Sequence, residues 1–469
     1  MMNTKENQQP KRTSLSRKGE SPSEIAPVAI DLVTHHKLEI LRRKEDLLEE
    51  ILSRKNMQRA WNQVCRNKGA AGTDGLSIED TEKVLKTEWP RIKESLLNGS
   101  YKPTPVKEVR IPKPNGGERK LGIPIVKDRL IQQAIAQTLM KYIDDSFEDT
   151  SYGFRPGRSA KQAVLQARKH AVGGYEVIID IDLEAFFDTI NQDRLMSELK
   201  KKIGDQRVLN LIRRYLNSGI MTTLGREERA EGVPQGGPLS PLLSNIYLDA
   251  LDKEAARRGH KYVRYADDCK ILVRTERAGK RVMESIRKFI EKKLKLRVNE
   301  EKSGVSKEGQ ILGFVVSKRS LEIMPKALRR FKDKIRDLTP IRGGRSVESI
   351  LEALAPVIRG WGEYFKIQTR KSSFKGIDAW IRRRIRALIY QSYKNGSTRY
   401  RAFRREGIGH HVAFTCAHAN YGPWSMALCK PMRIIFSEKK LKDMGLISLA
   451  ALFCVDWKMH KLQLMGCIP

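Results

Sequence analysis

Apolar positions recur along the chain with two spacings, and each spacing predicts one kind of element. Spacings of three and four residues predict helices, and short β-branched runs bounded by turn residues predict strands. The expected helices are a first packed helix over 36–51, a second that ends near Leu97, and others after Ser159, after Pro241 and over 282–294. The expected strands are the two arms of a hairpin over 111–124, then 177–179, 261–264, 269–273 and 311–316.

The last third of the chain keeps only the helical spacing. One apolar stripe runs from Ile350 to Phe365 and a second from Ile377 to Ile389, and both are expected to be helix cores. Between 326 and 405 there are 22 Lys or Arg but only 6 Asp or Glu. The side chains of Arg382, Arg383 and Arg386 lie mostly off the second stripe. They are predicted to line a groove that follows a nucleic-acid backbone, with a solvated helix face as the alternative.

Composition supports a polyanionic partner. The 469 residues include 90 Lys or Arg and 55 Asp or Glu, a formal charge of +35, which favours nucleic-acid binding over a merely adhesive basic protein. Residues 1–35 are polar and basic and predict a flexible leader. No signal peptide or membrane-spanning run is found, so a cytoplasmic protein without a membrane partner is expected. The six cysteines lack Cys-x-x-Cys spacing, which argues against a zinc module.

Two adjacent acids stand between the strands expected at 261–264 and 269–273. The connecting residues are Tyr265-Ala266-Asp267-Asp268, so both carboxylates lie at the tip of a predicted hairpin. Like charges this close repel, and a divalent cation with oxygen ligands relieves the repulsion. A solvated Asp-Asp turn is the alternative for a bare pair.

A third acid is expected to join this pair from another strand. Asp182 follows the predicted strand 177–179, and an aspartate beyond the end of a buried strand faces the crevice where sheets bind ligands. Asp180 and Asp188 are the alternatives. Two Mg²⁺ ions held by Asp182, Asp267 and Asp268 would activate a 3′-hydroxyl and stabilise the charge on a leaving pyrophosphate. Mn²⁺ is expected to substitute.

Two further segments fit a nucleotide substrate. The Asn115-Gly116 turn predicts a hairpin that brings Lys113 and Arg119 near each other, either to bind a triphosphate or as surface charges. The glycine loop at 232–237 lets a substrate approach its backbone, and Gln235 is placed to reach a base or sugar.

Several motifs together resemble the group II intron reverse transcriptase/maturases, from about Asn56 nearly to the C-terminus. The motifs are Ser151-Tyr152-Gly153-Phe154-Arg155-Pro156, Asp182-Leu183-Glu184-Ala185-Phe186-Phe187-Asp188, Gly232-Val233-Pro234-Gln235-Gly236-Gly237-Pro238-Leu239-Ser240-Pro241, Tyr265-Ala266-Asp267-Asp268 and Arg359-Gly360-Trp361. The resemblance implies an α+β fold: a right-hand polymerase with fingers and palm on antiparallel sheet, a helical thumb and a basic C-terminal domain. The implied domains are an N-terminal extension and fingers at 36–150, a fingers/palm catalytic domain at 151–325, a thumb/maturase domain at 326–395 and a nucleic-acid-binding domain at 396–469.

The resemblance also assigns site residues. Asp182, Asp267 and Asp268 hold the metals, with a backbone carbonyl of Ile181 or Leu183 as a further ligand. Phe187 lies under the sugar and selects deoxynucleotides. The incoming dNTP is contacted by Lys113, Arg119, Phe187, Gln235 and Lys302. The primer and template are contacted by Arg155, Gly236, Gly237, Leu312, Gly313 and Phe314.

The implied function is an RNA-directed DNA polymerase that is also a splicing cofactor. Its partners are the parent intron RNA, an RNA template with a DNA primer, target DNA and dNTPs, in the cytoplasm near the bacterial nucleoid; a homodimer is left open. The C-terminus lacks the cysteine pairs of a His-Asn-His nuclease, which resembles the compact bacterial class. The alternatives are a maturase with a vestigial polymerase site, and a domesticated enzyme of DNA repair or phage defence.

Overall fold

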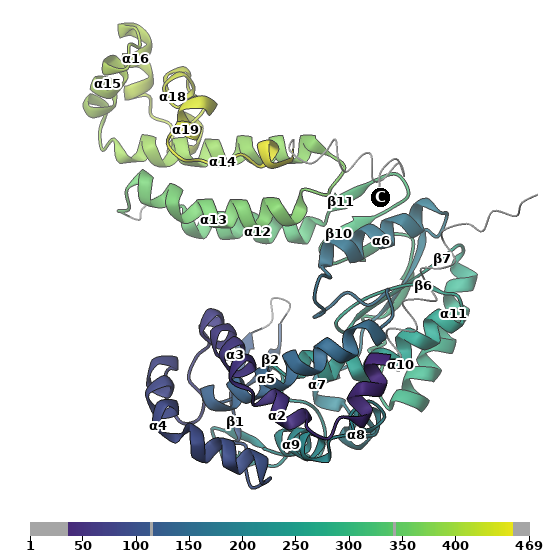
Figure 1. Cartoon of the computed structure of the whole chain (residues 1–469). Coiled ribbons are helices and arrows are strands. Elements are labelled where there is room, and N and C mark those ends of the chain that lie inside the picture. Colours follow the sequence, from purple (N-terminus) through teal and green to yellow (C-terminus); the bar gives the residue numbers. More distant parts are fainter. Residues whose placement is uncertain (1–35, 113–115, 341–343, 454–469) are drawn as a thin grey trace, which may run out of the picture. The chain divides into compact units, whose positions relative to one another are not determined.

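The computed structural model describes residues 36–112, 116–340 and 344–453, which divide into two compact units. The first contains the described residues up to Phe147 together with Asn191–Ile246, and the second contains Glu148–Ile190 and the described residues from Tyr247 onward. The predicted leader at 1–35 and Lys113 lie outside the described residues. Figure 1 shows the elements of both units.

These units differ from the predicted domains. The predicted boundary at 150 is close to the division after Phe147, but the segment 191–246 belongs with the N-terminal unit rather than with the catalytic strands. The predicted thumb at 326–395 shares a unit with those strands. The reason is that the chain leaves the second unit after Ile190 and returns through α10 (Ser240–Arg257), and sequence order does not reveal such a return.

The first unit packs helices around a four-stranded sheet. The strand order is β2-β1-β4-β5, with β1 and β4 parallel and the other pairs antiparallel. Strands β1 and β2 pair antiparallel as the two arms of the predicted hairpin, and residues 113–115 between them lie outside the described residues. The elements are α2 (Leu47–Ile51), α3 (Arg54–Asn67), α4 (Ile78–Leu97), β1 (Val106–Pro112), β2 (Glu118–Ile123), α5 (Val126–Ile143), η1 (Asp144–Ser146), α8 (Gln192–Lys200), α9 (Gln206–Leu216), β4 (Ile220–Thr222), β5 (Gly225–Glu227) and the start of α10.

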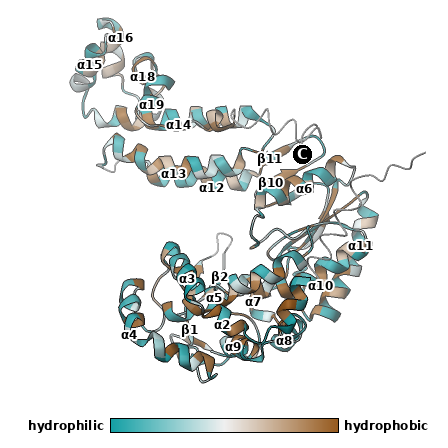
Figure 2. Cartoon of the chain, viewed as in Figure 1, coloured by the Kyte–Doolittle hydropathy of each residue, from teal (hydrophilic) through white to brown (hydrophobic). Residues whose placement is uncertain are grey.

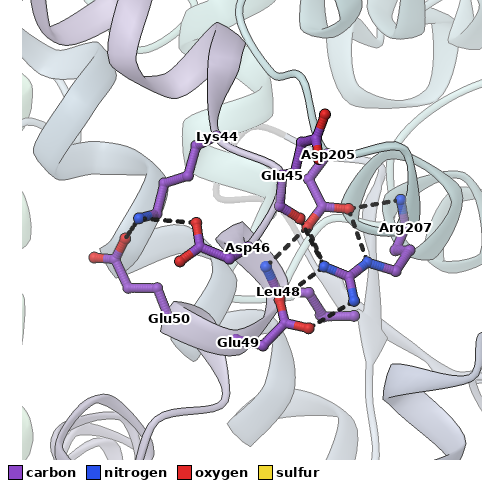
Figure 3. Close-up of polar contacts among 8 residues, drawn as sticks. All are labelled: Lys44, Glu45, Asp46, Leu48, Glu49, Glu50, Asp205 and Arg207. Carbon is purple, nitrogen blue, oxygen red and sulfur yellow. Dashed lines mark hydrogen bonds and ion pairs between the residues drawn. The ribbon is translucent and has the colours of Figure 1, made fainter.

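The single helix predicted over 36–51 is wrong, because the chain forms one helix over 36–43 and a second, α2. Asp46, the residue before α2, makes no capping hydrogen bond with its side chain. Instead Asp205, at the start of α9, accepts a hydrogen bond of 3.0 Å from the backbone N–H of Leu48. Arg207 donates to Glu49 at 2.6 and 2.7 Å, as Figure 3 shows. Asp205, from a distant segment, thus caps the N-terminus of α2, and the chain starts a second helix there instead of continuing the first.

The second unit contains two antiparallel sheets and the C-terminal helices. Its four-stranded sheet has the order β6-β7-β3-β8, and its three-stranded sheet has the order β11-β10-β9. The elements up to the second sheet are α6 (Ala160–Val172), β3 (Val177–Ile181), α7 (Phe186–Thr189), β6 (Lys261–Tyr265), β7 (Asp268–Val273), α11 (Glu276–Phe289), η2 (Ile290–Leu294), β8 (Gly304–Ser306), β9 (Gly309–Ile311), β10 (Phe314–Val316) and β11 (Leu321–Ile323). The side chain of Ser159 caps α6, as predicted.

The strand predicted over 311–316 is also wrong, because a tight turn divides it into β9 and β10. Leu312 and Gly313 both have left-handed backbone angles, with φ of 48° and 86°. A side chain at Gly313 would lie 3.3 Å from the ring of Phe365. The Leu-Gly pair within an apolar run is the sequence signal for this turn.

The thumb is helical, as predicted. It consists of α12 (Pro325–Leu338), α13 (Val347–Phe365) and α14 (Lys371–Ser392), and Figure 2 shows hydrophobic and hydrophilic residues alternating along each. Phe331 and Trp361 stack with ring centroids 4.2 Å apart. The described residues after the thumb form the short helices α15 (Gly396–Arg405), α16 (His410–His418), α17 (Pro423–Met426), α18 (Lys430–Ile435) and α19 (Glu438–Asp443), and 449–453 are also helical. Among the helices that the structure describes, none has the length and hydropathy of a membrane span.

Candidate active site

The predicted catalytic hairpin is formed by β6 and β7. Tyr265 pairs with Asp268 at the end of the ladder, and Ala266, at the turn, has a left-handed φ of 58°. Strand β7 continues the sheet by pairing with β3, in which Ile181 faces Cys269. The hairpin tip and the end of β3 therefore lie side by side in one sheet, which is the juxtaposition that the sequence predicted.

Asp182 directly follows β3 and is held by its backbone. Its N–H donates to the hydroxyl of Ser303 at 2.9 Å, and its carbonyl accepts from the N–H of Asn299 at 2.9 Å. Burial raises the pKa of the Asp182 carboxyl, nearby Lys302 lowers it, and the charges of Asp267 and Asp268 raise it further. The structure thus brings the three predicted acids and Lys302 into electrostatic contact.

Lys270 is a cation at this site that sequence reasoning missed. Only 5% of the residue is exposed, and its ammonium forms a short ion pair with Asp180 and a second, of 2.8 Å, with Asp268. Burial lowers the pKa of Lys270, but Asp268 and Asp180 outweigh it and the net shift is upward. The sequence signal was the alternation along each strand, which puts Asp268 and Lys270 on one face of β7.

The acids fit Mg²⁺ differently from the predicted three-aspartate set. Among the residues that the structure describes, no group of three or more His, Cys, Asp or Glu is arranged to hold a metal ion. Mg²⁺ takes one or two carboxylates and completes its shell with water and substrate phosphate. Asp268 already forms an ion pair with Lys270, and which of the predicted acids bind Mg²⁺ stays a prediction. Of the proposed backbone ligands, Ile181 pairs with Cys269 and Leu183 forms an isolated bridge with Val298.

A fully buried arginine, Arg264, holds the β6–β7 hairpin in place through several side-chain contacts. Arg264 and Asp252, on α10, are both 0% exposed and form a two-pronged ion pair of 2.5 and 2.7 Å. The same guanidinium donates to the carbonyl of Ala266 at 2.9 Å and to the hydroxyl of Ser151 at 2.7 Å. One side chain therefore joins α10, the 151–156 loop and the catalytic turn.

The 151–156 loop packs directly on that turn. A side chain at Gly153 would lie only 2.2 Å from the backbone nitrogen of Ala266. Arg155 was predicted to contact primer or template, but it is buried and donates to the carbonyls of Glu148 and Ser151 at 2.8 and 2.9 Å. Arg155 therefore stabilises the loop, because its guanidinium donates hydrogen bonds to backbone carbonyls that water does not reach.

We expect Gly153→Ala to reduce primer extension more than it reduces stability. The added methyl must displace the backbone of Ala266, which carries the catalytic aspartates next in the chain. The matched control is Gly376→Ala on α14, where a methyl group meets no atom within 4 Å. Both extension rates are measured at a temperature at which both variants are folded. Equal rates in the two variants would contradict the role given to the contact between Gly153 and Ala266.

The predicted sugar contact, Phe187, lies in the short helix α7. Its half-buried ring is 5.2 Å from that of Phe186, and the two planes meet at 67°. Phe186 is buried and lies 6.5 Å from the ring of Tyr247. A packed aromatic neighbour therefore limits the motion of the Phe187 ring, as steric selection of a sugar requires.

The other predicted nucleotide contacts belong to the first unit. Arg119 is exposed on β2, where it pairs with Ile111. The glycine loop packs on the same strand: the carbonyl of Gln235 accepts from the N–H of Gly122 at 2.8 Å. A side chain at Gly236 would lie 2.8 Å from the carbonyl oxygen of Gly122, and one at Gly237 would lie 2.5 Å from the side chain of Gln132.

The predicted primer contacts form the turn between β9 and β10. Phe314 is 0% exposed and packs between the rings of Tyr364 and Phe365, so this side chain is core rather than surface. Leu312 accepts a hydrogen bond of 2.8 Å through its carbonyl from the hydroxyl of Tyr364. The thumb helix α13 thus holds the turn, and only its half-buried residues, Leu312 and Gly313, remain candidates for contact with a primer.

Comparison with known proteins identifies the chain. Residues 111–316 match the family model described as reverse transcriptase (RNA-dependent DNA polymerase), and residues 328–407 match the group II intron, maturase-specific domain. The chain is 32% identical to protein YkfC of Escherichia coli over 279 residues, which is 51% of this chain and 73% of that protein. It belongs to the group II intron reverse transcriptase/maturase family. The catalytic segment is accordingly an RNA-directed DNA polymerase domain.

The reverse transcriptase/maturase is also similar to a longer relative and to two solved structures. It is 30% identical to the group II intron-encoded protein LtrA of Lactococcus lactis over 359 residues, 59% of this chain, and spans 60% of LtrA. Among solved structures, telomerase from Candida albicans has a TM-score of 0.41 at 14% identity, covering 79% of this chain and 68% of that one. A partial Cas6-RT-Cas1--Cas2 complex has a TM-score of 0.35 at 25% identity, covering 52% and 42%.

The arginines predicted to bind RNA along α14 have partners within the reverse transcriptase/maturase itself. Arg383 donates to the carbonyl of Trp424 at 3.0 Å, with its guanidinium 4.2 Å from the centre of the Trp424 ring. Arg386 donates to the carbonyl of Phe436 at 2.8 Å, and Arg382 pairs with Glu438 at 3.3 Å. These side chains attach the C-terminal helices to α14, and their role in RNA binding stays a prediction.

Proposed function

We propose that the protein is the RNA-directed DNA polymerase and maturase of a group II intron, adding dNTPs to a primer 3′-hydroxyl with two Mg²⁺ ions. The observation that carries the proposal is that the end of β3, before Asp182, and the tip of the β6–β7 hairpin, with Asp267, lie side by side in one sheet within the reverse transcriptase domain. The maturase-specific domain and the excess of Lys and Arg support intron RNA as a partner.

The chain contributes positioning and charge to this reaction. Asp182 and Asp267 would hold Mg²⁺, which supplies activation of the 3′-hydroxyl and stabilisation of charge on the transferred phosphoryl group and the leaving pyrophosphate. Ser303 and Asn299 fix the backbone of Asp182, so its carboxylate needs little reorganisation. Lys302, close enough to lower the pKa of Asp182, adds positive charge for an incoming triphosphate.

Extension of a DNA primer on an RNA template by the purified protein tests this proposal. Extension is expected with Mg²⁺, is expected to stop with a chelator and to return with Mg²⁺ or Mn²⁺. No extension under any of these conditions, together with retention of one specific intron RNA, would favour the maturase with a vestigial polymerase site. We further propose splicing assistance, target-primed reverse transcription during retrohoming, and a location in the bacterial cytoplasm at the nucleoid. A gene outside any intron would favour the domesticated alternative.

Phe187→Ala is expected to relax sugar selection. Without the ring, a 2′-hydroxyl meets no steric barrier, and the ratio of kcat/KM for dNTP over rNTP should fall by about tenfold or more. Single-nucleotide incorporation kinetics measure this ratio. Phe414→Ala on α16 is the matched control, since this ring is exposed on a C-terminal helix. Unchanged discrimination in Phe187→Ala would refute the role of the ring.

A further inference from the structure

Lys270 and its two acidic partners occupy one face of the catalytic sheet. Lys270 pairs with Asp180 across the ladder of β3 and β7, and Asp268 is two residues away on the same strand and face. The side chain of Lys270 is 7% exposed, whereas those of Asp180 and Asp268 are 40% and 34% exposed. The ammonium is therefore enclosed, and both carboxylates reach it from the solvent side.

This arrangement divides the acids of the site into two groups. Asp182 directly follows β3, and Asp267 lies at the tip of the β6–β7 hairpin, whose strand β7 pairs with β3. Asp268 and Asp180 instead share one cation that belongs to the protein. Charges in a partly buried site are screened by water and salt much less than charges on the surface. The charge of Lys270 should therefore have a large effect on the affinity for a nearby divalent ion.

We propose that Lys270 is a built-in cation that holds Asp268 and restricts metal binding by the substrate-free enzyme to Asp182 and Asp267. The inference rests on the proposed function, since it concerns the same metal site. Recruiting Asp268 as a ligand then requires its ion pair with Lys270 to break. Lys270 is in this sense a positioning residue that sets how much divalent metal the enzyme needs, and Asp180 is the acid that retains it.

Metal binding without substrate tests the inference directly. Lys270→Met keeps the length of the side chain and removes its charge, which leaves Asp180 and Asp268 uncompensated. The dissociation constant for Mn²⁺ should fall by about tenfold or more. A ligand that binds only the folded protein raises its melting temperature, so a titration of thermal unfolding with Mn²⁺ measures the change. Lys270→Arg keeps the charge and should bind Mn²⁺ like the wild type.

Three further variants separate this role from a general structural one. Lys253→Met removes a lysine paired with Asp249 on α10, 49% exposed, and should leave Mn²⁺ binding unchanged. Lys270→Met combined with Asp268→Asn should lose the gained affinity, because the released carboxylate is gone. If Lys270→Met does not fold, Lys270→Gln provides a neutral side chain that still donates hydrogen bonds to both acids, and the same gain is expected.

The Mg²⁺ dependence of primer extension provides a second, separate measurement. The Mg²⁺ concentration for half-maximal primer extension should be several-fold lower in Lys270→Met than in the wild type. If the wild type does not extend primers, the proposed polymerase function fails, and the Mn²⁺ titrations still decide about Lys270. Equal Mn²⁺ affinity in the wild type, Lys270→Met and Lys270→Arg would overturn the inference even if the polymerase is active.

Discussion

Asp267→Asn is expected to lower Mg²⁺-dependent primer extension on RNA by at least about a thousandfold. The substitution keeps the shape of the side chain but removes one of the two carboxylates proposed to hold Mg²⁺. Charge stabilisation by a bound metal is worth several kcal/mol, and each loss of about 1.4 kcal/mol lowers the rate tenfold. Single-turnover extension measures the effect, because it isolates chemistry from product release.

The matched control is Asp188→Asn, an exposed aspartate in the first turn of α7. This acid was an alternative third ligand, so near-normal extension in Asp188→Asn excludes it from the metal site. Retention of intron RNA should survive both substitutions. Full extension by Asp267→Asn would refute the active site, and loss of RNA retention would show that the fold itself had changed.

Arg264→Met should be the most destabilising substitution at the site. It leaves Asp252 buried without a partner, and breaking a buried ion pair in this way costs about 3–5 kcal/mol. It also removes the hydrogen bonds to the carbonyl of Ala266 and the hydroxyl of Ser151. Chemical denaturation measures the loss of stability, and extension at a temperature where the variant stays folded measures the loss of rate.

A double variant separates these two effects. Arg264→Met with Asp252→Leu replaces the ion pair by apolar side chains, a change that is often neutral for stability in other proteins. Stability should therefore return, while extension stays low because nothing restores the bond to Ala266. Recovery of both stability and rate would show that Arg264 acts only as a structural residue.

Much of the site was predictable because its signals are local. The hairpin at 261–273, the strand that ends before Asp182 and the thumb helices α13 and α14 follow from apolar spacing and turn residues. The order of the motifs indicated the family, and the two matched domains agree.

Other features depend on partners that are distant in the sequence. Asp205 begins α2 from 157 residues away, and Arg264 reaches back 113 residues to Ser151. The roles of Arg155 and Phe314 were misjudged because a motif indicates that a residue matters but not whether its side chain is buried. The return of 191–246 to the first unit had no signal in the spacing of apolar residues.

The sequence by itself determined the catalytic hairpin, the strand before Asp182, the thumb helices α13 and α14, and the family to which the chain belongs. Those properties arise from neighbouring residues, since backbone preference and the alternation of side chains act over a few positions. Only the tertiary structure decided that Lys270 pairs with both Asp180 and Asp268, and that Arg264 secures the catalytic turn. The strength of an electrostatic interaction depends on the distance between the charges and on the exclusion of water, and the order of residues along the chain reveals neither.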